Sequence, residues 1–431
     1  MKIINEKKLN DIFKKNNSDE DQLYKKIRNI INDIKINKKS ALKKYTKKFD
    51  NIEIDDFKIE KDILKNCYEN LDSKKRDALK YSIKNIKTFS RKQLNLFKEF
   101  EVEIEKNFFL KQKIKPINSI GAYVPGGNFP LVSSALMSIV PAKVAGVKNI
   151  SACIPPDKKY SNLINPTVAA ALFLLEVDNV YSAGGAQAIG ALAYGCKNIK
   201  KVDKIVGPGN KYVTAAKKIV YGDVGIDFPA GPSEILIIAD ESSNSDYIVS
   251  DLLSQSEHDV DTKSFLITTS TDLVKQVSKK IEEVIKNTTS AVLKQSLNNN
   301  CFILKTDSLE SSCKISDKIA PEHLEIQTEN NKYLENKLNN YGTLFVGENS
   351  CEPLGDYSSG LNHILPTDGA ARFTGGLNVK DFIKMQTVLD VRNINKQNKK
   401  IYETSKIIAD IEGMKEHFKS LEMRGKKNQQ S

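Results

Sequence analysis

Hydrophobic and polar residues follow three different patterns along the chain. Residues 1–110 are highly charged, have apolar residues at helical spacing and contain no glycine or proline, which predicts mostly helices. From Ile117 to about Ile238 the chain is richer in glycine and alanine and less charged. After about Lys380 the pattern is again helical and polar. The chain is therefore expected to have helical ends around an α/β middle.

The middle region repeats a short apolar strand, a turn with glycine and a helix. The strand SIGAYV leads into residues 125–127, NVYSA into residues 184–185 and DKIV into residues 207–209. This alternation predicts βαβ units whose right-handed crossovers bring the three turns to the carboxyl edge of a parallel sheet. Glycine turns before helices can hold a dinucleotide pyrophosphate. None matches G-x-G-x-x-G, so ordinary tight βα turns remain an alternative.

A second α/β stretch follows the glycine-rich region. EILIIAD, SFLITTS and TLFVG are predicted strands, and a helix is predicted from about Asn244 to Gln255. The chain has 431 residues, which is long enough for two or more domains with their own cores.

Composition narrows the class of protein. No run approaches the roughly 18 apolar residues that cross a bilayer, and the N-terminus lacks the apolar core of a signal peptide. We therefore expect a cytoplasmic protein without a membrane partner. The formal net charge of +12 comes mostly from scattered lysines, without RNA-binding aromatic motifs or zinc fingers. It indicates a solvated lysine-rich surface, and no nucleic-acid partner is expected.

The four histidines lie in segments that also contain carboxylate or amide side chains. In DLLSQSEHD (251–259), Gln255 and His258 are spaced i, i+3 and lie near each other on a predicted helix. In APEHLEI (320–326), Glu322 and His323 are adjacent and offer two bases of different strength. Taken alone, either pair is also compatible with a surface hydrogen bond or a structural role.

The other two histidines are His363, which follows Asp356 on a glycine-flanked turn, and His417, which follows Glu412. Zinc prefers imidazole together with oxygen donors. Four side chains from distant segments provide this mixture: Gln255, His258, Asp356 and His417.

From about Ile117 to Phe418 the chain resembles the histidinol dehydrogenase family. The likeness is carried, in the family's order, by GAYVPGG, GGAQAIGALAYG, VDKIVGPGNKYV, AGPSEILIIAD, DLLSQSEHD, APEHLEI, GDYSSGLNHILPT and ARFTGGLNVKDF. Residues 1–110 contribute nothing specific to it. The family's fold implies two incomplete, doubly wound, Rossmann-like α/β domains with small helical N- and C-terminal extensions.

The resemblance also implies a division into domains. Residues 1–19 are expected to form an N-terminal helical extension, and residues 20–122 plus 232–377 a larger α/β domain. Residues 123–231 are expected to form an inserted Rossmann-like NAD-binding domain. Residues 378–431 are expected to form a C-terminal helical arm for dimerisation.

The family's functional residues map onto matching positions of this chain. The implied zinc ligands are Gln255, His258, Asp356 and His417, and the implied acid/base pair is Glu322 and His323. The substrate-contact positions are Ser233, Gln255, His258, His323, Asp356, Glu412 and His417, with His363 as a secondary candidate. The NAD-contacting positions are Tyr123, Gln187 and Asn210, one in each glycine-rich βα turn.

The activity implied by the resemblance is oxidation of L-histidinol through L-histidinaldehyde to L-histidine, the last steps of histidine biosynthesis. It requires two NAD⁺ and one Zn²⁺ per subunit, in a homodimer whose C-terminal arm completes the partner's site. A paralogous zinc- and NAD-dependent dehydrogenase of another polar alcohol is the alternative. Retention of five residues favours histidinol: Ser233, Glu322, His323, Glu412 and His417. A zinc hydrolase is a weaker rival because no H-E-x-x-H motif is present.

Overall fold

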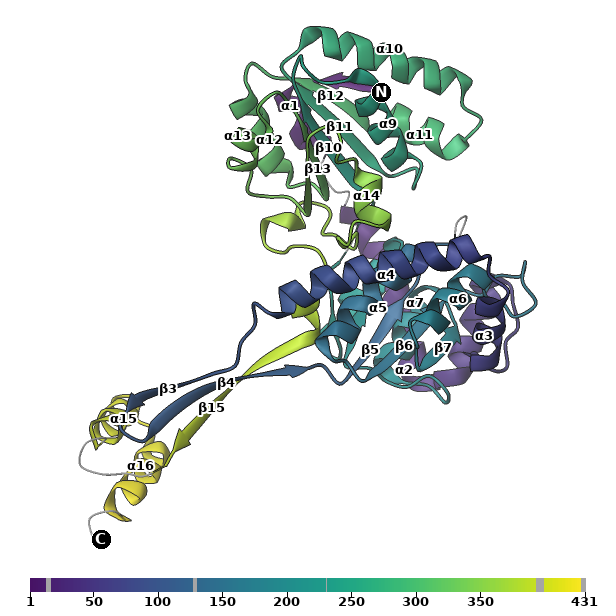
Figure 1. Cartoon of the computed structure of the whole chain (residues 1–431). Coiled ribbons are helices and arrows are strands. Elements are labelled where there is room, and N and C mark those ends of the chain that lie inside the picture. The colour runs from purple at the N-terminus through teal and green to yellow at the C-terminus, as the bar shows by residue number, and fades with distance from the viewer. Residues whose placement is uncertain (13–16, 127–129, 230, 393–398, 428–431) are drawn as a thin grey trace.

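The computed structural model describes residues 1–12, 17–126, 130–229, 231–392 and 399–427. Over these residues the chain forms two six-stranded sheets and one three-stranded sheet. Figure 1 shows two α/β domains, one above the other, and an arm that extends away from both.

The first α/β domain is built on a sheet whose central strands are parallel. Its strand order is β2 (Lys58–Ile59), β7 (Asn179–Ser182), β6 (Asn149–Ile154), β5 (Ser119–Tyr123), β8 (Lys204–Val206) and β9 (Gly225–Ile226), with β2 antiparallel to β7. The strands predicted in SIGAYV, NVYSA and DKIV are therefore confirmed as β5, β7 and β8. Their shared direction brings the three glycine turns to one edge of the sheet.

Helices cover both faces of this sheet. They are α2 (Asn17–Asp50), α3 (Lys61–Glu69), α4 (Ser73–Leu94), α5 (Val132–Ala145), α6 (Pro166–Leu174), α7 (Gly185–Tyr194) and α8 (Lys211–Val220). α2 packs against α7 and α8, while α3 packs on α6 and α4 on α5. Asn165 and Asn210 cap α6 and α8, since each side chain accepts hydrogen bonds from backbone N–H groups of the first helical turn.

The second α/β domain has an entirely parallel sheet. Its order is β1 (Lys2–Ile4), β12 (Cys301–Lys305), β11 (Lys263–Thr268), β10 (Glu234–Ala239), β13 (His323–Gln327) and β14 (Thr343–Val346). β10 reads EILIIA and is buried throughout, as expected for a central parallel strand covered on both faces. Its helices are α1 (Glu6–Ile12), α9 (Ser245–Ser256), α10 (Thr271–Asn287), α11 (Ala291–Asn300), α12 (Leu309–Ile319), α13 (Asn331–Glu335) and α14 (Glu352–Tyr357).

The arm combines a three-stranded antiparallel sheet with two helices. Strand β4 (Phe108–Pro116) lies between β3 (Phe100–Glu105) and β15 (Ile383–Val391). The short 3₁₀ segments η1 (Ala370–Arg372) and η2 (Val379–Phe382) precede β15, and α15 (Lys399–Ile411) and α16 (Lys415–Lys427) follow it. Phe108 and Tyr402 pack edge to face with ring centroids 5.7 Å apart, which attaches α15 to the sheet.

The prediction of mostly helices in residues 1–110 is confirmed by α1 to α4, although β1, β2, β3 and the start of β4 also lie there. The C-terminal stretch needs a correction, because β15 precedes its helices α15 and α16. Phe100, Val102 and Ile104 alternate with glutamates, a period-two pattern that favours a strand. The predicted α/β fold class itself is confirmed.

The sheets also group the chain differently from the expected domain division. β1 pairs with β12 and Leu9 is buried in the core of the second domain, so the N-terminus is not a separate helical extension. Residues 20–122 were expected to join residues 232–377. Instead α2, α3 and α4 pack on the first sheet, together with most of residues 123–231.

The glycine turn after β8 is held by a buried ion pair. Lys217 donates to the carbonyl oxygen of Gly207 (2.9 Å), and Asp227 accepts from the Gly207 N–H (2.8 Å). Lys217 and Asp227 also pair with each other, and both side chains are buried. Gly207 has φ +115°, and a Cβ there would overlap the backbone carbonyl oxygen of Tyr123. The ion pair therefore fixes a turn that only glycine can form.

We predict that Lys217→Met lowers the free energy of unfolding by about 3–5 kcal/mol, because it leaves the Asp227 carboxylate buried without its counter-charge. Urea titration of the full chain measures the change. Lys218→Met is the matched control: Lys218 is exposed on the same helix, so its loss should change stability by less than about 0.5 kcal/mol. Equal effects of the two substitutions would show that the buried pair does not hold this turn.

Candidate active site

Glu322 and His323 lie where two central strands of the second domain begin. Both side chains are buried, with 6% and 3% of their surface exposed. Glu322 Oε2 accepts a hydrogen bond from the backbone N–H of Glu234 (2.8 Å), and His323 Nδ1 lies 3.0 Å from the Glu234 carbonyl oxygen. β10 and β13 are neighbours in the sheet, so one residue of β10 orients both side chains.

The contact with Glu234 fixes the tautomer of His323. A carbonyl oxygen can only accept, so Nδ1 carries the hydrogen and donates it. Nε2 of the neutral ring is then an acceptor. Nε2 is buried, and no group in the described part of the chain hydrogen-bonds to it. The imidazole therefore presents a basic nitrogen, oriented by the backbone, to whatever binds in front of it.

A cluster of metal-ligand atoms lies in front of this nitrogen. α9 and the residues just after it contribute Gln255 and His258, while α14 contributes Glu352 and Asp356. Ligand atoms of His258, Glu352 and Asp356 all lie within 4.8 Å of one another. His323 Nε2 is 3.7 Å from Asp356 Oδ1 and 3.9 Å from Glu352 Oε1.

The donor set fits a divalent cation. Gln255 Oε1, Glu352 Oε1 and Asp356 Oδ1 are buried oxygens without a hydrogen-bond partner among the described residues. Buried polar atoms are normally satisfied, so these oxygens have lone pairs available to a ligand, and those of Glu352 and Asp356 lie together with His258. Imidazole, amide and carboxylate donors together suit zinc.

The pKa values of the cluster reflect crowded negative charge. Burial raises the pKa of Glu322 to about 8 and that of Glu352 to about 9. Burial opposes the charged form of His323, but the neighbouring carboxylates outweigh it and raise the pKa to about 10. Burial also opposes ionisation of Asp356, yet the adjacent imidazoles of His323 and His363 lower its pKa overall. These carboxylates favour the protonated His323 ring when no cation is bound. A bound cation would offset the same excess of negative charge and favour the neutral ring, whose Nε2 accepts a proton.

Glu352 and the polar residues behind it did not emerge from the sequence. Glu325 Oε1 accepts from the backbone N–H of Glu352 (2.9 Å). The Gln327 amide donates to Glu325 and to Asp251, at 3.2 Å each. Burial and the nearby Asp251 raise the pKa of Glu325 to about 8. The i, i+4 spacing of Glu352 and Asp356 was the one signal that could have revealed Glu352.

His363 holds α14 against the first domain. Its Nδ1 donates to the Asp356 carbonyl oxygen (3.1 Å), and its Nε2 lies 3.5 Å from the hydroxyl of Ser134 on α5. Burial lowers the pKa of His363, which favours the neutral ring that this arrangement needs. The structure thus places this predicted secondary candidate behind Asp356, where it supports a cluster residue.

α4 adds further hydrogen bonds between the domains. Ser82 donates its hydroxyl to the carbonyl of Tyr357, and Asn85 donates its amide to the carbonyl of Ser358 (2.8 Å). Asn362 donates to the carbonyl of Met137 on α5 (2.8 Å). The segment that carries Glu352 and Asp356 is therefore anchored on the domain that contains the glycine turns.

Three of the predicted site residues lie apart from the cluster or at its margin. His417 and Glu412 are exposed on the arm, and Figure 1 shows α16 at the far end of the arm from α14. Within one chain the structure does not bring them to Gln255, His258 and Asp356. Ser233 immediately precedes β10, half-buried, and its carbonyl accepts from the backbone N–H of Lys263 (3.0 Å).

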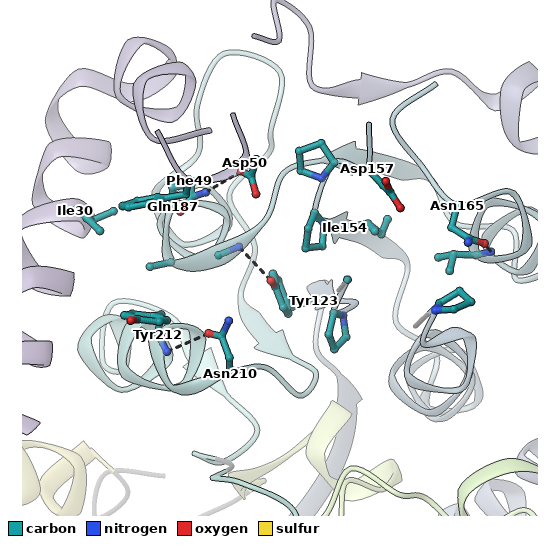
Figure 2. Close-up of a pocket in the computed structure, with 18 of the residues that line it drawn as sticks. Ile30, Phe49, Asp50, Tyr123, Ile154, Asp157, Asn165, Gln187, Asn210 and Tyr212 are labelled. Atoms are coloured by element: carbon teal, nitrogen blue, oxygen red, sulfur yellow. Dashed lines mark hydrogen bonds between the residues drawn. The ribbon is translucent and has the colours of Figure 1, made fainter. Parts of the chain in front are cut away.

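Tyr123, Gln187 and Asn210 line one cavity of about 640 Å³ at the glycine-turn edge of the first domain. Figure 2 shows these three side chains around the cavity. Tyr123 Oη accepts from the backbone N–H of Gly185 (3.0 Å), and Asn210 caps α8. Gly126 and Gly185 also line the cavity, whereas Gly127 of the first turn lies outside the described residues. The volume is in the range of small-molecule and cofactor sites.

The molecule is an α/β protein with an imidazole–carboxylate cluster in one domain and a glycine-lined cavity in the other. A family model described as histidinol dehydrogenase matches residues 13–425. The chain therefore belongs to the histidinol dehydrogenase family of oxidoreductases, as the sequence motifs predicted.

Similar proteins cover nearly the whole chain. Histidinol dehydrogenase of Methanocaldococcus jannaschii is 40% identical over 415 residues, 96% of this chain and 95% of the relative. That of Methanococcus maripaludis is 39% identical over 422 residues, 98% of each protein. The crystal structure of histidinol dehydrogenase from Elizabethkingia anophelis superposes with a TM-score of 0.89 at 34% identity, covering 99% of this chain and 98% of that one. Within the described ranges, no helix is long and apolar enough to cross a membrane.

Proposed function

We propose that the chain oxidises L-histidinol through L-histidinaldehyde to L-histidine, with the transfer of two hydrides to two NAD⁺. The observation that carries this proposal is the buried His323 ring, whose Nδ1 is tied to a backbone carbonyl and whose Nε2 faces a carboxylate-rich cluster. Beside it, Glu322 provides a second base of different strength. Membership of the histidinol dehydrogenase family supports the choice of substrate.

The proposed metal ligands are Gln255, His258 and Asp356, completed by His417 from a second copy of the chain. The unpartnered oxygens of Gln255 and Asp356 support this set. When bound, one Zn²⁺ per subunit would hold the imidazole and amino nitrogens of histidinol and so orient its carbinol carbon. Ser233 and Glu412 complete the proposed substrate contacts, and His363 supports Asp356 from behind.

His323 serves the first oxidation as a general base. Its Nε2 accepts the proton of the alcohol oxygen while the carbon–hydrogen bond releases a hydride, which leaves the aldehyde. The backbone carbonyl of Glu234 keeps the ring oriented as the proton arrives, because it still accepts from Nδ1. NAD⁺, held along Tyr123, Gln187 and Asn210, is the hydride acceptor.

Glu322 serves the second half of the reaction. Its carboxylate takes a proton from a water molecule as that water adds to the aldehyde carbon, and the protonated His323 returns its proton to the carbonyl oxygen, which gives the hydrate and a neutral His323. The hydrate then loses a proton to His323 and a hydride to the second NAD⁺, which gives the carboxylic acid. A carboxyl group whose pKa is raised to about 8 by burial can exchange a proton near neutral pH.

We further propose a homodimer in which each arm reaches the partner's cluster. The arm exposes many large apolar side chains, and apolar surface of this kind marks interfaces. Its exposed apolar residues include Phe100, Val102, Ile104, Met385, Leu389, Ile407, Ile408, Ile411 and Met414. A twofold assembly would cover these side chains and bring the His417 imidazole to a donor set that has an open position.

The first prediction concerns stoichiometry and metal dependence. L-histidinol with excess NAD⁺ should yield two NADH for each molecule consumed, since both oxidations occur at one site. A chelator should abolish the reaction, and Zn²⁺ should restore it. Absorbance of NADH measures both. Turnover of another polar alcohol in preference to histidinol, or activity that survives removal of all bound metal, would contradict the proposal.

The second prediction separates the roles of the two bases. Glu322→Gln keeps the shape of the side chain but removes the base, so oxidation of L-histidinaldehyde should fall by about 10²–10⁴. Alcohol oxidation should fall much less, because His323 remains. Single-turnover assays that start from each substrate measure the two steps. Glu329→Gln, at an exposed position after β13, is the control; equal loss of both steps in Glu322→Gln would refute this division of labour.

The third prediction tests the exchange of arms by complementation. His417→Ala and Asp356→Asn should each be inactive as homodimers. In a mixed dimer, the intact cluster of the His417→Ala chain would receive the intact arm of the Asp356→Asn chain. Co-expression should therefore restore about a quarter of normal activity: half of randomly formed dimers are mixed, and each has one complete site. Arms that serve their own chain would restore none.

A further inference from the structure

The cavity next to the glycine turns has a wall that the motifs did not indicate. Its lining includes Lys26, Phe49 and Asp50 of α2, a helix outside the expected NAD-binding segment 123–231. Asp50 is the last residue of α2. In Figure 2 its carboxyl group lies near Gln187, on the same side of the cavity as Phe49 and Ile30, with Asn165 on the opposite side.

Asp50 is a half-buried carboxylate that lines the cavity, and its hydrogen bond with Gln187 is long. One oxygen lies 3.4 Å from the Gln187 amide nitrogen. Burial raises the pKa of Asp50 to about 6, and no neighbouring charge contributes to the shift. At neutral pH the group is therefore mainly ionised, and its remaining acceptor capacity is available to a ligand's hydroxyl groups.

Another lining residue connects the cavity with the catalytic cluster. Pro130, which lines the cavity, precedes α5 by two residues. Ser134 in the first turn of α5 lies 3.5 Å from His363, whose ring contacts Asp356. A dinucleotide that accepts a hydride from a substrate at this cluster would place its nicotinamide beside Pro130. We infer that its adenosine half then lies along the α2 wall.

We propose that Asp50 is the cofactor-specificity residue: its carboxylate accepts hydrogen bonds from the adenosine ribose hydroxyls of NAD⁺ and repels the 2′-phosphate of NADP⁺. In Rossmann folds an acidic residue about 20 positions after the glycine motif performs this task. Here the carboxylate comes from a helix that precedes the first sheet strands in sequence. The inference rests on the proposed use of NAD⁺ and adds to it the residue that selects this dinucleotide.

Lys26, which also lines the cavity, bears on the binding of NADP⁺. Lys26 Nζ lies 5.4 Å from the ring centroid of Tyr212 and 6.0 Å from that of Phe49, so it lies among the aromatic residues at the same end of the cavity. With the charge of Asp50 removed, this ammonium group is a lining cation that can pair with a 2′-phosphate. Loss of the carboxylate should therefore shift the ratio of the two affinities from NAD⁺ towards NADP⁺.

The test is equilibrium binding of four ligands to the whole chain, measured by titration calorimetry. In Asp50→Asn, the affinities for NAD⁺ and ADP-ribose should fall by about 10- to 100-fold, the range for a lost hydrogen bond to a charged group. The affinity for NADP⁺ should fall less or rise, and that for nicotinamide mononucleotide should stay the same. Asp50→Glu keeps the charge and should keep the preference against NADP⁺ even if NAD⁺ binds more weakly.

Glu53→Gln is the matched control, because it removes the same unit charge at an exposed position three residues away. It should leave all four affinities unchanged. An unaltered ratio of NAD⁺ to NADP⁺ affinity in Asp50→Asn would overturn the inference. A loss of affinity confined to nicotinamide mononucleotide would also overturn it, because the nicotinamide half of the dinucleotide would then lie at α2. Failure of the unmodified protein to bind NAD⁺ and ADP-ribose would overturn the cofactor assignment itself.

Discussion

Three carboxyl groups surround one buried imidazole in the second domain. The nearest oxygens of Glu322, Asp356 and Glu352 lie 3.6, 3.7 and 3.9 Å from ring nitrogens of His323. Like charges at such range are costly in a buried place unless opposite charge offsets them. In the proposed enzyme a divalent cation and the imidazole share that task. The same crowding separates the proton affinities of Glu322 and His323, which is what a sequence of two proton abstractions requires.

The fold connects this cluster to the cofactor cavity through α14. This helix has only six residues and carries two carboxylates of the cluster. Its C-terminal end is fixed by Ser82 and Asn85 of α4, and the carbonyl of Asp356 accepts from His363, which contacts α5. The first domain therefore sets the position of the ligand helix while it also supplies the glycine turns. A hydride can pass between the two sites only if this relation is kept within a fraction of an ångström.

Local patterns in the sequence predicted the strands, helices and turns, because these depend mainly on residues close together in the chain. Alternating strands and glycine turns gave the parallel sheets, and the shared strand direction explains why Tyr123, Gln187 and Asn210 line one cavity. Short motifs also indicated Glu322 and His323, which lie side by side at the start of β13, and His258, which lies beside Asp356. Side chains contributed by distant packing were missed: Asp50 comes from a helix with no motif, and nothing in its neighbours indicates a cofactor.

The arm also depends on contacts between distant parts of the chain, which local sequence patterns do not predict. β15 pairs with β4, some 270 positions earlier in the chain, and sequence spacing does not predict such a pairing. The period-two pattern of β3 was present in the sequence but is short and surrounded by helical segments. His417 and Glu412 could be aligned with a family motif, yet within one chain they lie exposed on the arm, and the proposed dimer is what would give them a site.

We propose that four side chains bind one cation, three from distant segments of one chain and one from a second chain. Diffraction from zinc-loaded crystals, recorded on both sides of the zinc absorption edge, tests this most directly. We expect one anomalous peak per subunit. It should lie about 2.0–2.2 Å from donor atoms of Gln255, His258, Asp356 and a second chain's His417. A peak elsewhere, or one whose ligands come from a single chain, would contradict it.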